Sequence, residues 1–271
     1  MPIKLNWTGS AICATSRSGS GEKELFRFSD EARLLREVCL GSWLFEQAES
    51  VFDPFCGVGQ FSLSVPRSLR ALGSDVSPRA ISYAKINARI NLRRNIEFLR
   101  ADVSDSNLWR TAYDRDASPL IASNPPFGPT PVASRNALHS AAGWWGDRFI
   151  LKTLSMGRDC LPSFSAALLG IALCGDGDRN SLVERVREQV GLSPKWLHCA
   201  GESFWRLGAR RQLKSPASLR VVPDVSGNYA QWGLRRDWQR WTEWMQERGY
   251  ERLEYGVLVI RNRSVAWKAP Y

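Results

Sequence analysis

Four short polar motifs recur along the first half of the chain, each directly after an apolar run. They begin at Asp53, Asp75, Asp102 and Asn124, separated by 22, 27 and 22 residues. One strand followed by one helix occupies about that much chain, so we expect the motifs at the carboxyl ends of successive parallel strands. Ligands bind at this edge of an open parallel sheet. The spacing therefore predicts a ligand site there.

The first motif, "DPFCGVG", combines an acid with two spaced glycines. It matches a dinucleotide fingerprint weakly, because Ser62 stands where the third glycine would be. A carboxylate at Asp53 would also repel a pyrophosphate, whereas it suits an amine or a sulfonium-bearing amino acid. Asp75 can accept two ribose hydroxyls, and Asp102 an adenine amine. These requirements describe S-adenosylmethionine better than NAD.

The fourth motif, "NPPF", pairs hydrogen-bond acceptors with an aromatic ring. A planar amine conjugated to a ring is a poor nucleophile, because its lone pair is delocalised. The Asn124 side-chain oxygen and the Pro125 carbonyl could accept both of its N–H groups and localise that lone pair, held by prolines that fix φ. Pro126 and Phe127 would contact the substrate, with the Phe127 ring stacked on it. The motif thus favours transfer to a flat nitrogen.

The strands and helices that would position these motifs alternate along the chain. Strands are expected within 50–55, 69–76, 96–103, 119–127, 165–174, 195–201 and 254–263, and helices within 28–40, 59–65, 78–90, 146–160 and 181–190. A short helix or loop is expected up to about 116. This rhythm predicts an α/β, Rossmann-like, doubly wound and mostly parallel sheet of seven strands. Residues 1–45 are interpreted as an arm, without regular structure up to 24, and a helix. Residues 46–271 are the domain that carries the site.

A basic, tryptophan-rich segment, 202–253, is added before the last strand. Within it, 204–223 hold five basic residues and no acid. Such a run can bind phosphates or be a solvated loop; the substrate contacts expected here are Arg206, Arg210, Arg211 and Lys214. A helix follows in which Leu234, Trp238, Trp241 and Met245 fall at helical spacing, and Trp238 and Trp241 are expected to pack this helix on the sheet. Trp144 and Trp145, shortly after "NPPF", are predicted to line the substrate mouth.

The motifs "DPFCGVGQF", "GSDVSPRAISYAKINARIN", "IEFLRADV" and "IASNPPFG" resemble those of class I S-adenosylmethionine-dependent methyltransferases of the N-P-P-(Y/F) amino-methyltransferase type. They are similar to RNA guanine-N2 and adenine-N6 methyltransferases. The 50 residues before the first motif are too few for the THUMP domain that accompanies the guanine-N2 enzymes, and Phe55 replaces the usual first glycine. The resemblance implies cofactor binding by Asp53, Phe55, Gly57, Gly59, Asp75, Val76, Asp102, Val103 and Asn124. It implies catalysis by Asn124, Pro125 and Phe127.

The composition of the chain indicates the kind of partner that it binds and its cellular location. The net charge is +10, which suits a polyanion, and RNA is expected in preference to DNA. Six scattered cysteines and two histidines predict neither a disulfide framework nor a metal site. No apolar run is long enough to span a membrane, so a cytoplasmic protein is expected, with rRNA processing as its setting.

The predicted function is N-methylation of an exocyclic amino group of a nucleobase, in RNA. The alternative is methylation of an amide or guanidino nitrogen, in a protein glutamine or a small molecule. A carboxamide presents the same two N–H groups to the two acceptors. A silent, cofactor-shaped binding module is a third interpretation, which the intact acids and glycines disfavour.

Overall fold

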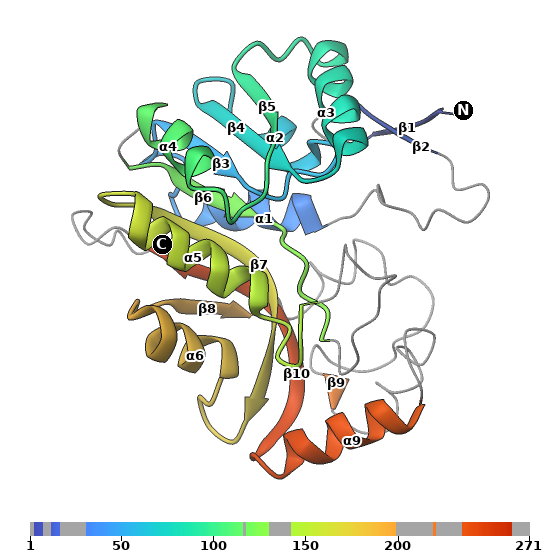
Figure 1. Cartoon of the computed structure of the whole chain (residues 1–271), viewed down its shortest axis with the longest axis vertical. Helices are drawn as coiled ribbons and strands as arrows, with labels where there is room; N and C mark the ends of the chain where they lie inside the picture. The colour runs from blue at the N-terminus through green and yellow to red at the C-terminus, as the bar shows by residue number, and fades with distance from the viewer. Residues whose placement is uncertain are drawn as a thin grey trace. The chain divides into compact units, whose positions relative to one another are not determined.

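The computed structural model describes residues 3–7, 12–16, 31–115, 118–129, 142–198, 219–220 and 235–261. Its helices are α1 Glu31–Gly41, α2 Gln60–Ser64, α3 Pro78–Ile90, α4 Ser106–Arg115, α5 Arg148–Cys160, α6 Ser181–Val190 and α9 Arg235–Gln246. Its strands are β1 Ile3–Trp7, β2 Ile12–Ser16, β3 Ser50–Asp53, β4 Arg70–Asp75, β5 Ile96–Arg100, β6 Leu120–Ser123, β7 Ser165–Gly175, β8 Lys195–His198, β9 Leu219–Arg220 and β10 Tyr250–Ile260. Strands and helices alternate from β3 to β8, as predicted (Figure 1).

The main sheet has the strand order β5-β4-β3-β6-β7-β10-β8, with β9 paired to β10. The pairings β3–β4, β4–β5, β3–β6 and β6–β7 are all parallel. The chain moves outward from β3 through β4 to β5 and then returns to the other side of β3 as β6. That reversal is the topological switch point at which open α/β sheets bind ligands.

The predicted sheet is confirmed, with one correction in strand number. Among the described residues, eight strands join the sheet instead of seven, because the two-residue β9 pairs with Arg252 and Leu253 of β10. The last strand also begins at Tyr250 and not at 254. Its first residues are too polar to stand out as an apolar run, although Tyr250 and Leu253 are buried.

By internal contacts the chain divides into two compact units. Unit 1 comprises 1–124, 152–168 and 259–271, and unit 2 comprises 125–151 and 169–258. In unit 1, β3 and β6 are buried at all four of their residues. Buried parallel strands of this kind are continuous apolar runs, which is why the sequence pattern revealed them.

Helix α3 of unit 1 begins where the sequence predicts. Ser77 is its N-cap, with the side-chain oxygen accepting a bond from the Ala80 amide at 3.2 Å, and Pro78 is the first helical residue. Proline is favoured at that position, because its missing N–H would have no partner there. The helix lies against β4 and β5 (Figure 1).

The N-terminal arm is not irregular throughout, so that expectation is wrong for two segments. β1 and β2 pair antiparallel, from Ile3 opposite Ser16 to Trp7 opposite Ile12. The Asn91 side chain holds the hairpin, since Oδ1 accepts from the Ile12 amide at 2.8 Å and Nδ2 donates to the Ile12 carbonyl at 2.6 Å. Two five-residue strands leave too weak a periodic signal to be recognised from sequence.

Unit 2 is organised around an aromatic core. Trp241 and Met245 of α9 are fully buried and pack with Tyr250 and Leu253, which confirms the packing role predicted for Trp241. The side chain of Trp238, for which the same role is predicted, lies outside the described residues. The rest of the predicted added segment lies largely outside the described residues, including 221–234. The division of the chain at residues 45 and 202 remains a prediction.

Candidate functional site

Asp53 ends β3 as a buried carboxylate, only 2% exposed. Its Oδ1 accepts a hydrogen bond from the Ser123 hydroxyl at 2.6 Å, and its Oδ2 accepts one from the Ser62 hydroxyl at 2.8 Å. The Ser123 Oγ in turn accepts from the Phe55 amide at 3.2 Å. This network ties the carboxyl end of β3 to the carboxyl end of β6, on the two sides of the switch point.

Burial dominates the electrostatics of Asp53. It raises the pKa of this carboxyl from 3.8 to about 6, although the bonds from Ser123, Ser62 and the Phe55 amide oppose the shift, and Asp75 adds to it. A charge without a cation beside it is costly in such a position. The fold therefore holds an acid in a place where a cationic ligand would relieve the cost.

The loop after β3 turns through two left-handed glycines. Gly57 has φ +52° and Gly59 has φ +83°. At Gly59 a Cβ would also lie 2.8 Å from Cζ of Phe98, so both the backbone conformation and the packing require glycine. At Gly57 a Cβ would meet nothing within 4 Å, which means that this part of the loop borders open space.

Asp75, at the end of β4, is positioned by that loop. Its Oδ2 accepts from the Gly57 amide at 3.1 Å, and its Oδ1 accepts from the Ser77 amide at 2.9 Å. Burial raises the pKa of Asp75, while these two amide bonds act to lower it. A carboxylate has about four acceptor sites, so it can still accept two hydroxyls.

The remaining residues predicted to bind the cofactor lie at the same strand ends. Val76 follows β4 and is 58% exposed. Asp102, two residues after β5, is exposed, and its Oδ1 accepts from the Ser104 amide at 2.7 Å. Val103 is buried, and its carbonyl accepts from Trp109 Nε1 at 2.7 Å. Asp102 thus forms a local turn, and its role with an adenine amine stays a prediction.

Asn124 directly follows Ser123 at the end of β6. Its Oδ1 is buried and has no hydrogen-bond partner among the described residues. Buried acceptors are nearly always paired, and leaving one unpaired costs about 1–3 kcal/mol. This side-chain oxygen, next in sequence to the Asp53–Ser123 network, is therefore available to accept a hydrogen bond.

The rest of the "NPPF" motif belongs to unit 2. Pro125 is buried, and Pro126 and Phe127 are half-buried. The Phe127 ring packs edge-on against Tyr255, with 5.9 Å between centroids. Phe127 is therefore held in a fixed place, which a stacking residue requires.

The tryptophan loop, Ala142–Asp147, is packed on this motif. The Ala142 amide donates to the Gly128 carbonyl at 2.9 Å, and a Cβ on Gly146 would lie 2.5 Å from the Phe127 carbonyl oxygen. Trp144 is 41% exposed, and its carbonyl accepts from Trp241 Nε1 at 2.8 Å. The loop brings exposed aromatic surface close to Phe127.

Trp145, in contrast, is largely committed to internal packing. Its ring contacts Trp244 and Tyr250, with centroids 4.7 and 5.8 Å away, and the Arg185 guanidinium lies 4.8 Å from its centroid. Arg185 also forms an ion pair with the buried Asp147. A substrate role for Trp145 remains a prediction, as does the one for Trp144.

Four predicted substrate contacts, Arg206, Arg210, Arg211 and Lys214, lie outside the described residues. Within the described residues, no group of three or more His, Cys, Asp or Glu side chains could hold a metal ion. No described helix is long and apolar enough to cross a membrane.

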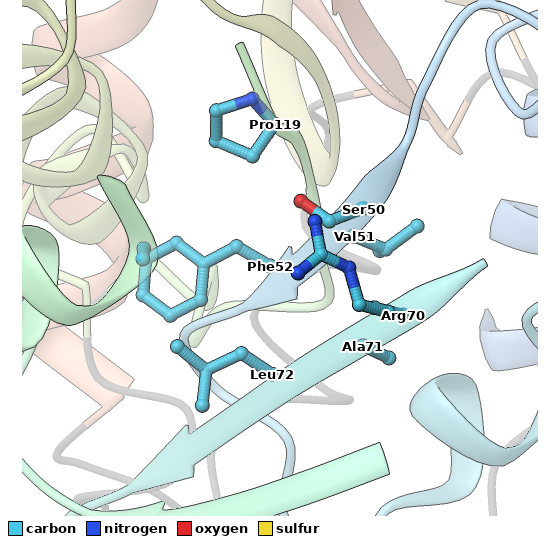
Figure 2. Close-up of a pocket in the computed structure, with 8 residues that line it drawn as sticks. Ser50, Val51, Phe52, Arg70, Ala71, Leu72 and Pro119 are labelled. Carbon is cyan, nitrogen blue, oxygen red and sulfur yellow. The ribbon is translucent and has the colours of Figure 1, made fainter. Parts of the chain in front are cut away.

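A hollow in unit 1 lies at the opposite edge of the sheet. It is lined by Ser50, Val51, Phe52, Arg70, Ala71, Leu72, Ala112 and Pro119, at the start of β3, β4 and β6 (Figure 2). Its empty volume of about 230 Å³ includes open solvent and is below the roughly 300–1,000 Å³ of ordinary ligand pockets. We assign it no role in the site.

Sequence reasoning missed Ser62 and Ser123, the two partners of Asp53. Ser62 was noted only as a missing glycine. Ser123 directly precedes "NPPF", and an acid and a hydroxyl at adjacent strand ends would have been a usable signal.

No protein-family profile matches the chain. Curated relatives match only part of it. An uncharacterized RNA methyltransferase of Halalkalibacterium halodurans is 33% identical over 100 residues, which are 36% of this chain and 22% of the relative. The 23S rRNA (uracil(1939)-C(5))-methyltransferase RlmD of Psychromonas ingrahamii is 37% identical over 68 residues, 24% of this chain and 15% of the relative. The matched segments thus span about a fifth of the relatives' length.

Solved structures agree over most of the chain. A SAM-dependent methyltransferase from Streptococcus mutans aligns with a TM-score of 0.51 at 11% identity, covering 95% of this chain and 55% of that one. A methyltransferase structure in complex with SAH aligns with a TM-score of 0.52 at 11% identity, covering 95% of this chain and 56% of that one. The fold is that of class I methyltransferases.

Proposed function

We propose that the chain is an S-adenosylmethionine-dependent methyltransferase that acts on RNA. The class I fold, the segments shared with RNA methyltransferases and the net charge of +10 support this function. The preferred target is an exocyclic amino group of a nucleobase. The observation that carries this choice is the buried, unpaired Oδ1 of Asn124 at the end of β6.

The residues at the strand ends fit the donor. Asp53 faces a cationic amino-acid group directly or through water, Gly57 leaves the loop open on one side, and Asp75 accepts the ribose hydroxyls. The exposed Val76 and the Asp102–Val103 turn border the adenine, and Phe55 lies in the loop between them and Asp53. When bound, S-adenosylmethionine supplies a methyl group activated by a sulfonium.

The acceptor motif orients the nucleophile. Asn124 Oδ1 and the Pro125 carbonyl accept the two N–H groups of the amine, which turns its lone pair toward the methyl group. Phe127, held by Tyr255, stacks on the base, and Pro126, Trp144 and Trp145 border it. No dedicated general base is required, because the product ammonium loses its proton to solvent. Arg206, Arg210, Arg211 and Lys214 are proposed to contact phosphates.

A second candidate is methylation of a uracil carbon, which the names of the curated relatives favour. C5 of uracil is a weak nucleophile until another nucleophile adds at the neighbouring C6, so this reaction requires a group such as a thiolate. Among the described residues, Cys39, Cys56 and Cys174 are buried and Cys160 is half-buried. Alanine variants of these four, and of Cys13 and Cys199, would separate the two routes.

The test is the identity of the product. The chain is incubated with methyl-labelled S-adenosylmethionine and separate RNA, DNA, protein and metabolite fractions, and labelled RNA is digested to nucleosides for mass spectrometry. We expect N-methylguanosine or N-methyladenosine, lost in Asn124→Ala and retained in the exposed control Asn107→Ala. Release of tritium from RNA carrying 5-tritiated uridine would identify the carbon route. Label confined to protein would establish the glutamine alternative and overturn the RNA assignment.

A further inference from the structure

Helix α3 and the loop after it form an unusually basic part of unit 1. Residues 76–96 contain five basic side chains and no Asp or Glu. The only acid between residues 54 and 96 is Asp75, which belongs to the candidate donor site. A surface helix normally mixes both signs of charge, so an acid-free stretch of this length indicates an anionic partner.

Three of these basic side chains are exposed and uncompensated. Lys85, Arg89 and Arg94 are all exposed, and none has an ion pair among the described residues. Some other exposed arginines have carboxylate partners, since Arg33 lies 2.8 Å from Glu37 and Arg158 lies 2.9 Å from Asp159, whereas Arg110 and Arg187 are exposed without an ion pair among the described residues. We call Lys85, Arg89 and Arg94, together with the exposed Ile86 and Ile90, the α3 face.

Two further arginines hold the loop after α3 in place through bonds to backbone carbonyls. Arg93 donates to the Leu63 and Val65 carbonyls, both at 2.7 Å, and Arg67 donates to the carbonyls of Asn91 and Leu92, both at 3.1 Å. Burial lowers the pKa of Arg93, and the neighbouring Arg67 lowers it further. Lys85, Arg89 and Arg94 are therefore presented by a rigid segment. Because they do not make the backbone bonds of Arg93 and Arg67, those bonds stay intact when an anion binds.

The α3 face extends away from the donor site. Ser77, whose amide binds Asp75, caps the start of α3, and the helix has 13 residues, about 20 Å at 1.5 Å per residue. Arg100 is exposed at the near end, where its Nε donates to the Val76 carbonyl at 3.3 Å. Positive charge thus runs from the strand ends to Arg94.

We propose that the α3 face binds the phosphate backbone of the RNA substrate. This inference rests on the proposed function, because it assigns a place to the polyanion on which that function acts. Lys85, Arg89 and Arg94 each neutralise a phosphate and release its counterions. Ile86 and Ile90 supply apolar contact to the sugars between them.

The experiment compares two triple variants of equal charge. K85Q/R89Q/R94Q removes the basic groups of the α3 face, and R33Q/R110Q/R158Q removes three charges from α1, α4 and α5. Binding of a fluorescein-labelled single-stranded RNA, without donor, is followed by anisotropy across roughly 50–300 mM NaCl. Thermal unfolding checks that both variants fold.

We expect the α3 variant to bind on the order of tenfold more weakly at low salt, with a salt slope reduced by about 2. The control should stay within about twofold of the parent chain. Equal losses in both variants, or an unchanged α3 variant, overturn the inference. The inference is also overturned if the α3 variant binds RNA like the parent chain and loses only its binding to anionic lipid vesicles. RNA binding that depends on the α3 face without any methyl transfer would overturn the proposed function and leave this inference standing.

Discussion

Replacing Asp53 by asparagine removes a charge that the fold holds at a cost. The carboxylate is 2% exposed, and burial raises its pKa from 3.8 to about 6. Each pKa unit corresponds to about 1.4 kcal/mol, so the ionised group opposes folding by about 3 kcal/mol at neutral pH. Asparagine keeps the shape and can still bond to Ser62 and Ser123, whose hydroxyls rotate.

The pH dependence has a defined sign. A carboxyl with a raised pKa in the folded state contributes stability that is complete below the unfolded pKa of 3.8 and lost as pH rises through about 6. Asp53→Asn has no carboxyl that can ionise at this position, so its stability does not fall in this way as the pH rises. We therefore expect the variant without ligand to be more stable than the parent chain at about pH 8, by 1 to about 3 kcal/mol, since some hydrogen bonding to Ser62 and Ser123 is weakened. The advantage should shrink between about pH 6 and pH 4.

Urea unfolding at several pH values measures this difference. Asp159→Asn, an exposed carboxylate beside Arg158, is the matched control and should gain no stability at neutral pH. The same Asp53 variant should bind S-adenosylmethionine more weakly, so stability and affinity move in opposite directions. A variant that is less stable than the parent chain across this pH range would refute the reasoning, because the hydrogen bonds would then outweigh the buried charge.

Three further predictions concern other parts of the molecule. Asn124→Ala should lose turnover far more than donor affinity, and Asp75→Ala should mainly lose donor affinity; steady-state kinetics and calorimetry would separate them, and equal losses of both quantities in each variant would contradict the roles. Gly59→Ala should destabilise the chain by about 2–4 kcal/mol in urea, from the left-handed backbone and the contact with Phe98, and a neutral effect would be inconsistent with this geometry. Trp241→Phe should cost more than about 1 kcal/mol in urea, because it removes the bond to the Trp144 carbonyl and leaves a cavity at a fully buried position; unchanged stability would argue against it.

Local signals explain the parts of the fold that the sequence predicted. Ser77 and Pro78 mark the start of α3 by cap chemistry, and its bounds match the prediction. The buried strands β3 and β6 stand out as apolar runs before polar motifs. In α9, Trp241 and Met245 stood out by helical spacing, and both are fully buried.

The unpredicted parts depend on contacts between distant residues. Ser123 and Asp53 are 70 positions apart, and no local pattern links them. The same holds for Trp241 and Trp144, 97 positions apart. Burial of the Asp53 carboxylate and the unpaired oxygen of Asn124 likewise appear only once the strands are side by side.

Calorimetric titration of the purified chain with S-adenosylmethionine tests the central claim most directly, since the donor is proposed to bind at the ends of β3 and β4. The account predicts saturable binding that is strongly weakened in Asp75→Ala and unchanged in Asp159→Ala, an exposed acid near the end of α5. Absence of binding by the parent chain, or equal affinity in both variants, would contradict it.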